Sequence, residues 1–159
     1  MPTKMRTLTV LATVVIPLAV AATAQTKDPF VGSWRLNVAK SKYSTPAPKS
    51  TTSTYEAVGK GYRVSVRTEP ASGPVQQWSY TTNLDGMDAP VTGNNPNADA
   101  IAAKRIDSNT IELVNKKAGK ITTTQRNVVS ADGKSRTVTT TGTDAQGQKV
   151  NNVTVFEKQ

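Results

Sequence analysis

The stretch DPFVGSWRLN, residues 28–37, decides how the rest of the chain is interpreted. Asp28 and Pro29 favour a short helical turn, with the aspartate as N-cap and the proline at the first helical position. Gly32 lets the chain bend sharply, and Trp34 opens the first expected strand. A short turn that leads into a barrel strand can lie across one end of the barrel, where the indole ring covers the base of the core.

The residues before this stretch have the pattern of a secretory signal peptide over 1–24. Lys4 and Arg6 form a basic head, an apolar run follows, and the triplet ATA at 22–24 places small residues at the positions that signal peptidase reads. We therefore expect cleavage after residue 24, a single domain over 25–159, and a secreted or periplasmic protein without a transmembrane segment. A retained membrane anchor is the alternative, but the apolar run is short for a bilayer span and is interrupted by threonine.

Composition limits the chemistry of the chain. The 159 residues include no cysteine and no histidine. Disulfides, the usual general base near neutral pH, Cys or Ser–His nucleophiles and the common zinc sites are thereby excluded. The eleven carboxylates lie mostly in or beside turns and form no paired-carboxylate or calcium-loop motif. We expect a protein that is not an enzyme and that holds no metal and no cofactor.

Repeated turn signals divide the chain after residue 28 into short runs with strand composition. Alternation is clear in 62–67, where Tyr62, Val64 and Val66 share one face. No stretch after residue 24 has a convincing helical period. We expect strands over 33–39, 51–57, 62–68, 75–82, 84–88, 99–106, 110–116, 120–129, 135–142 and 148–157.

This pattern predicts an all-β fold, an antiparallel up-and-down β-barrel of about 8–10 strands. A long meander leaves unpaired backbone groups at both edges, and closing the sheet removes the edges. A β-sandwich is the alternative, but it needs longer connections than these turns provide. In a barrel with an even number of strands the last strand pairs with the first, which would bring Lys158 over the Trp34 ring. Arg126 is a second candidate for that contact. The alternative is that the side chains of Lys158 and Arg126 both point into water.

At these residues the chain resembles the calycin superfamily. The Gly-x-Trp of lipocalins is matched by Gly32-Ser33-Trp34, and the front and end of fatty-acid-binding proteins are similar to FVGSWRL at 30–36 and FEK at 156–158. The longer run at 28–42 also resembles small, uncharacterised secreted bacterial proteins of lipocalin-like type. The resemblance implies a calycin barrel with an internal ligand. The Arg and Tyr with which fatty-acid-binding proteins hold a carboxylate would fall on Thr154 and Phe156, so that mechanism is not expected here.

A barrel of about eight strands is just wide enough to hold one small ligand. Four aromatic side chains on neighbouring strands are the candidates to line its cavity, and Arg126 or Arg105 could anchor an acidic ligand. The alternatives are that the aromatic residues form the packed core and that these arginines lie on the outer face with Arg63, Arg67 and Arg136. The predicted function is non-catalytic binding of a small hydrophobic or amphipathic molecule by a monomer, and the predicted ligand-binding residues are Tyr55, Tyr62, Trp78, Tyr80 and Arg126.

The formal charge supports a different class of function. The charge is +9, and removing Lys4 and Arg6 with the signal peptide leaves +7. Such a protein could be a surface module for anionic envelope components, either polysaccharide or lipid head groups, with a filled barrel. Nucleic acid is the poorer expectation for an exported protein. Scattered lysines that only keep a β-protein soluble are a further alternative. The basic residues concerned are Lys104, Arg105, Lys116, Lys117, Lys120, Arg126, Lys134 and Arg136.

Overall fold

The structure, a computed structural model, describes residues 27–159. The predicted signal peptide and its cleavage site lie outside the described residues. No helix capable of crossing a membrane occurs between residues 27 and 159.

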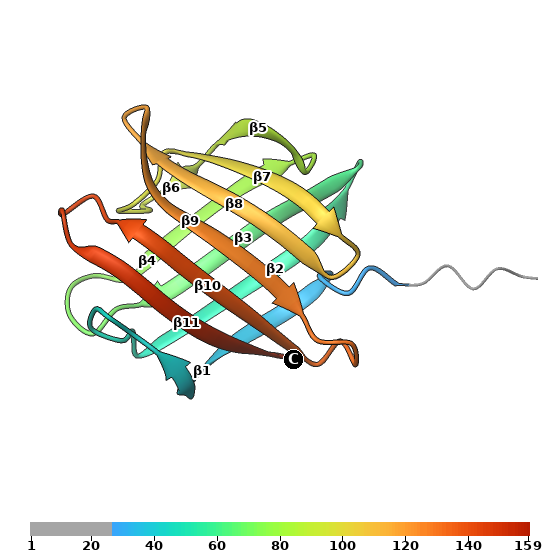
Figure 1. Ribbon diagram of the computed structural model, residues 1–159, viewed down its shortest axis with the longest axis horizontal. Helices are drawn as coiled ribbons and strands as arrows, with labels where there is room; N and C mark the ends of the chain where they lie inside the picture. The colour runs from blue at the N-terminus through green and yellow to red at the C-terminus, as the bar shows by residue number, and fades with distance from the viewer. Residues whose placement is uncertain (1–26) are drawn as a thin grey trace, which may run out of the picture.

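Eleven antiparallel strands in residues 27–159 form one sheet that curls into a nearly closed barrel (Figure 1). The predicted all-β, up-and-down barrel is confirmed, and each of the ten expected ranges overlaps one strand. The additional strand is β6, two residues long, which pairs with β4. The strands are β1 (Gly32–Lys42), β2 (Ser50–Val58), β3 (Gly61–Glu69), β4 (Gln76–Thr82), β5 (Asp85–Pro90), β6 (Thr92–Gly93), β7 (Ala100–Asp107), β8 (Thr110–Lys117), β9 (Lys120–Val129), β10 (Ser135–Thr143) and β11 (Lys149–Lys158).

The sheet runs in the order β5-β7-β8-β9-β10-β11-β1-β2-β3-β4-β6, so its two ends are β5 and β6. The first strand lies between β2 and the last strand, as predicted. Trp34 pairs with Lys158 and Leu36 with Phe156 across β1 and β11. Within the described residues no backbone ladder joins β4 to β5, and the barrel therefore has one seam.

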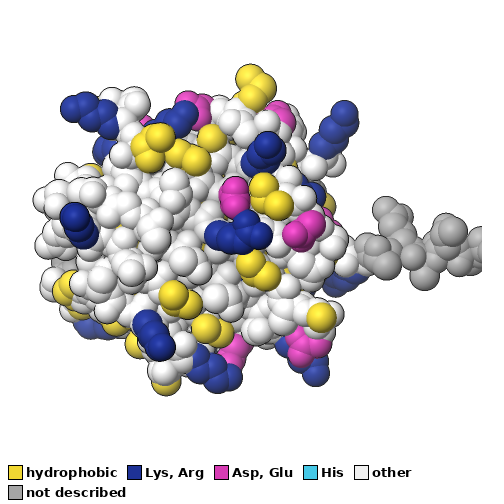
Figure 2. Space-filling model, viewed as in Figure 1, with side chains coloured by type: hydrophobic (Ala, Val, Ile, Leu, Met, Phe, Trp, Pro, Cys, Tyr) yellow, Lys and Arg dark blue, Asp and Glu magenta, His cyan; other side chains and the backbone are white. Residues whose placement is uncertain are grey.

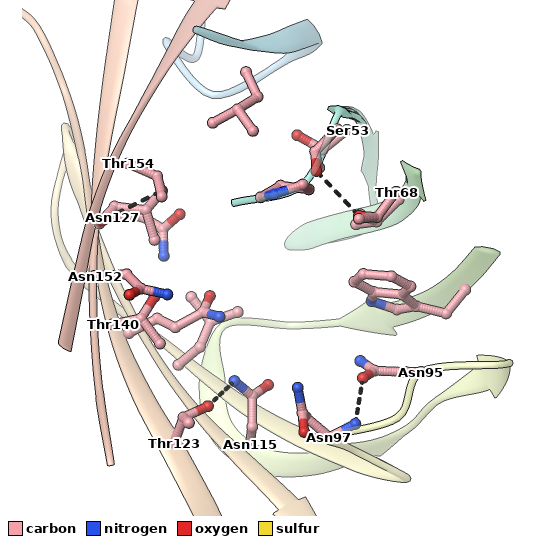
Figure 3. A pocket seen from close by; sticks show the side chains of 18 of the residues that line it. Ser53, Thr68, Asn95, Asn97, Asn115, Thr123, Asn127, Thr140, Asn152 and Thr154 are labelled. Carbon is pink, nitrogen blue, oxygen red and sulfur yellow. Dashed lines mark hydrogen bonds between the residues drawn. The ribbon is translucent and has the colours of Figure 1, made fainter. Parts of the chain in front are cut away.

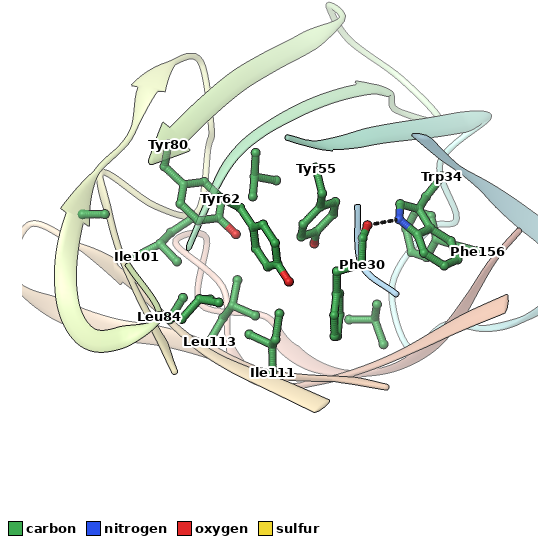
Figure 4. Close-up of a cluster of buried hydrophobic side chains, with 14 of the residues drawn as sticks. Phe30, Trp34, Tyr55, Tyr62, Tyr80, Leu84, Ile101, Ile111, Leu113 and Phe156 are labelled. Atoms are coloured by element: carbon green, nitrogen blue, oxygen red, sulfur yellow. Dashed lines mark hydrogen bonds between the residues drawn. The ribbon is translucent and has the colours of Figure 1, made fainter. Parts of the chain in front are cut away.

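The turn before β1 and the first tryptophan seal one end of the barrel (Figure 4). The segment at 28–31 forms one hydrogen-bonded turn and no helix, since the Val31 amide donates to the Asp28 carbonyl. The Phe30 amide donates to the Asp28 carboxylate, which is the bond expected of an N-cap aspartate. Phe30 and Trp34 are fully buried, and the Trp34 indole N–H donates to the Phe30 carbonyl at 2.9 Å. The predicted role of the indole as the floor of the core is confirmed.

A polar cluster fastens this floor to the wall. Arg105 on β7 donates to the Asp28 carboxylate at 2.8 Å, and the Tyr62 hydroxyl on β3 donates to the same carboxylate oxygen. Arg105 also hydrogen-bonds the Tyr62 hydroxyl and lies over the Phe30 ring. Burial and the adjacent Asp28 carboxylate raise the pKa of the Tyr62 phenol. The turn is thus held by strands on two sides of the barrel.

Candidate ligand cavity

A cavity of about 320 Å³ lies between this aromatic floor and the loops at the opposite end of the barrel. Its volume falls at the small end of the ~300–1,000 Å³ typical of ligand pockets. Strand alternation determines which side chains reach it. On β10, Arg136, Val138 and Thr140 point inward, whereas Thr139 between them is exposed on the outside.

Arg136 lies in the lining of the cavity and is only 3% exposed. One terminal nitrogen donates to the Tyr55 hydroxyl at 2.6 Å and to the Asn127 carboxamide oxygen at 2.9 Å. The other donates to the Ser53 hydroxyl at 2.8 Å. All three acceptors are neutral groups.

Aromatic rings surround the same guanidinium group. Its central carbon lies 4.5 Å from the ring centre of Phe156, 4.9 Å from that of Tyr55 and 5.4 Å from that of Trp34. The faces of these rings attract a cation. Arg136 therefore joins the aromatic floor to the polar interior above it.

Three buried side-chain polar atoms within residues 27–159 have no hydrogen-bond partner in the protein, and all belong to residues that line this cavity. They are the Arg136 Nε, the Asn127 Nδ2 and the Tyr43 hydroxyl. Buried polar groups in native proteins are otherwise paired in the great majority of cases. All three atoms thus belong to residues of one cavity lining, two of them at the floor end, where Arg136 bonds to Asn127, and Tyr43 at the loop end.

One part of the cavity wall is rich in amides and hydroxyls (Figure 3). Asn115 donates to the Thr123 hydroxyl at 2.9 Å, and Thr154 donates to the Val138 carbonyl. The Asn127 carboxamide points into the space at the centre of the view. The labelled polar residues are Ser53, Thr68, Asn95, Asn97, Asn115, Thr123, Asn127, Thr140, Asn152 and Thr154.

Another part of the wall is apolar. Trp78 and Tyr80 project inward from β4, beside Val64 and Val66 of β3. Burial raises the pKa of the Tyr80 phenol. The cavity is therefore amphipathic, with an aromatic and aliphatic side and an amide and hydroxyl side.

Loops cover the end of the cavity opposite the floor. Tyr43 and Asn97 come from the loops after β1 and β6, and Asp144 follows β10. The Ala145 amide donates to the Asn97 side-chain oxygen at 3.2 Å, which joins two of these loops. The Asp144 carboxylate accepts hydrogen bonds from two backbone amides of its own loop and so stabilises that turn.

The structure separates the five predicted ligand-binding residues into three places. Tyr55, Trp78 and Tyr80 line the cavity. Tyr62 lies in the sealed floor, hydrogen-bonded as described above. Arg126 lies on the outer surface, where it pairs with Glu112 at 2.5 Å.

Of the two basic residues expected near the indole, Lys158 makes the contact. Its ammonium lies 4.9 Å from the centre of the Trp34 ring and donates to the Pro29 carbonyl at 2.8 Å. Burial lowers the pKa of this ammonium. The expectation for Lys158 is confirmed, and that for Arg126 is wrong because Arg126 is occupied by Glu112 on the outer face.

The expected outward orientation of Arg136 is also wrong. Residues 135–142 are nearly all Thr or Val, so their composition does not distinguish the two faces of the strand. Register distinguishes them: Arg136 pairs with Val129 on one side and Phe156 on the other, and both partners are buried. A register prediction for β9–β11 would therefore have placed this arginine inside.

The basic residues of the second half do not form one surface. Arg136 is internal, Arg105 holds the floor, and Lys116 pairs with Asp88 at 2.7 Å. On the face seen in Figure 2, basic side chains are scattered and acidic ones lie between them. The module for anionic envelope components stays a prediction that these positions do not strengthen.

No group of three or more metal-ligating His, Cys, Asp or Glu side chains occurs in the portion of the chain that the structure describes. No protein-family model and no curated protein matches the sequence. The arrangement of the cavity is therefore the main guide to function.

Proposed function

We propose that this protein is an exported, calycin-like barrel that binds a small, partly apolar molecule in its internal cavity and catalyses no reaction. The observation that carries the proposal is a cavity of about 320 Å³ whose lining residues include all three unpartnered buried polar atoms of the described chain. A space with this lining suits a molecule that has both an apolar surface and hydrogen-bonding groups.

The packing of the barrel floor also supports the proposal. The floor is densely packed and tied to the wall, so binding a ligand above it requires no loss of the aromatic core. The chain is expected to act as a monomer after removal of the signal peptide, since the cavity is built from one barrel. The secreted or periplasmic location is part of the proposal and depends on the sequence pattern at 1–24.

The test uses two variants of neighbouring residues on β10. Thr140→Phe fills the cavity, whereas Thr139→Phe places the same ring on the exposed outer face. Isothermal titration calorimetry with 4-phenylbutanamide, a neutral amphipathic probe, measures binding to the mature protein. We expect one site in the wild type and in Thr139→Phe, and at least tenfold weaker binding in Thr140→Phe. Equal affinity of the two variants, or no binding to the wild type, would refute the cavity as the site.

A further inference from the structure

We infer that the ligand carries a single carboxylate group, which pairs with Arg136 at the inner end of the cavity. This inference rests on the proposed function and adds to it the charge and the orientation of the ligand. The buried guanidinium of Arg136 and its surroundings support it.

The positive charge of Arg136 is not balanced by the protein in residues 27–159. Five ion pairs occur there and none includes Arg136. Asp144, an acidic residue in the cavity lining, follows the end of β10 and lies eight residues after Arg136 in the chain, roughly 26 Å at the rise of an extended strand. A guanidinium cannot lose its proton to escape burial, and a buried charge is costly unless it is paired.

The aromatic rings around Arg136 offer a purely structural explanation for its burial. Phe156, Tyr55 and Trp34 attract the cation, and the neutral acceptors satisfy its terminal nitrogens. These contacts orient the group, but they leave its net charge unchanged. They also leave the Nε without an acceptor. A structural role therefore explains the position of Arg136 and not its unpaired donor and charge.

The unpartnered donors identify the kind of group that is missing. Arg136 Nε and Asn127 Nδ2 are both donors only, and Arg136 donates to the oxygen of the same Asn127 carboxamide. Both side chains are at least 97% buried. A carboxylate accepts hydrogen bonds from both types of donor and supplies one negative charge, which matches one guanidinium. A ligand amine would add a second donor and a second positive charge at the same place.

The orientation of the ligand follows from the wall. With the carboxylate at Arg136, the body of the molecule lies along Trp78 and Val66, and its outer end meets the amides and hydroxyls near the loops. The ligand is then an organic acid with an apolar body. A neutral lipid or an amine fits the same volume without satisfying the buried charge.

The first experiment compares three probes that differ only at one end: 4-phenylbutanoate, 4-phenylbutanamide and 4-phenylbutylamine. Calorimetry on the mature wild-type protein at neutral pH measures each affinity. We expect the carboxylate to bind at least tenfold more tightly than the amide, and the amine to bind most weakly. If the carboxylate and the amide bind equally well, the cavity remains a ligand site and the inference about Arg136 is wrong. If no probe binds, the proposed function fails with it.

The second experiment supplies the missing negative charge from the protein. Asn127→Asp keeps the shape of the side chain and places a carboxylate 2.9 Å from the Arg136 donor that now meets the amide oxygen. Asn151→Asp adds the same charge on the exposed face of β11 as a control. We expect Asn127→Asp to abolish the tenfold preference for the carboxylate probe and Asn151→Asp to keep it. An unchanged preference in Asn127→Asp would overturn the inference.

Removal of the positive charge of Arg136 tests the inference independently. Arg136→Gln keeps hydrogen-bonding capacity but removes the charge, so the ratio of carboxylate affinity to amide affinity should fall to about one. A folded Arg136→Gln variant that still prefers the carboxylate tenfold would contradict the inference. Circular dichroism establishes whether this variant folds, and the Asn127→Asp result decides the question if it does not.

Discussion

Trp34 and Lys158 are direct partners across the ladder that joins the first strand to the last, and the Lys158 ammonium lies 4.9 Å from the centre of the indole ring. The two residues are separated by nearly the whole described chain. Their contact closes the barrel along β1 and β11 and also covers its floor. The same pair therefore belongs both to the β1–β11 ladder and to the floor of the core.

We predict that the two members of this pair contribute very differently to stability. Trp34→Ala removes a fully buried ring and should lower the free energy of unfolding by about 3–5 kcal/mol. Lys158→Met keeps most of the apolar stem and removes the charge, which should cost about 0.5–2 kcal/mol. Urea unfolding followed by circular dichroism measures both values. A loss from Lys158→Met as large as that from Trp34→Ala would contradict this division of roles.

A second prediction concerns the hairpin between β2 and β3. A Cβ atom at Gly61 would lie 1.9 Å from the Thr82 carbonyl oxygen, so any side chain would force β3 and β4 apart. Gly59 has a φ of +57° but open space around it. We expect Gly61→Ala to cost about 3 kcal/mol and Gly59→Ala about 1 kcal/mol. Equal costs in denaturant unfolding would show that β4 does not approach β3 as closely as described.

The buried phenols lead to a prediction about alkaline pH. Burial raises the pKa of Tyr43, Tyr62 and Tyr80 above their ordinary value, so the folded chain keeps these protons when the unfolded chain has lost them. The contribution is fully present below the ordinary tyrosine pKa of about 10, and stability should fall as pH rises above it. Phenolate absorbance and urea unfolding measure the two effects. Ionisation of Tyr43, Tyr62 or Tyr80 at the ordinary tyrosine pKa of about 10 in the folded protein would contradict the burial described here.

The loop contact at the cavity entrance gives a kinetic prediction. Asn97→Ala removes the hydrogen bond to the Ala145 amide and leaves the Thr122 hydroxyl bonded to the Asn97 carbonyl. Association and dissociation of 4-phenylbutanamide should both become several-fold faster, and the equilibrium affinity should change less than either rate. Stopped-flow tryptophan fluorescence measures the rates, with Asn151→Ala on the outer face as the control. Unchanged rates in Asn97→Ala would mean that the ligand enters elsewhere.

The architecture was largely predictable because it depends on local signals. Turn residues mark the strand ends, and Trp34 after Gly32 marks the first strand, which is why the ten expected ranges and the β1–β11 pairing agree with the structure. The two-residue strand β6 was not predicted. Two residues are too few to show an alternating pattern of apolar and polar side chains. The pairing of this strand with Trp78 is a tertiary contact, which the local sequence does not encode.

The site was less predictable because it depends on register between strands. Tyr55 and Tyr62 lie on adjacent strands and both point inward, yet one reaches the cavity and the other the floor. Depth along the barrel separates them, and a sequence pattern of period two carries no information on depth. Arg136 was missed for a related reason, since its inward face is set by Val129 and Phe156 and not by its own neighbours in the chain.

The most direct test of the central claim is native mass spectrometry of the protein purified from its native cells, beside Thr140→Phe prepared in the same way. We predict that the wild type retains one small molecule, that denaturation releases it, and that the cavity-filled variant lacks it. Retention of the same molecule by both proteins would contradict a ligand site inside the barrel, as would a wild type that carries no molecule and binds none of the three phenylbutyl probes.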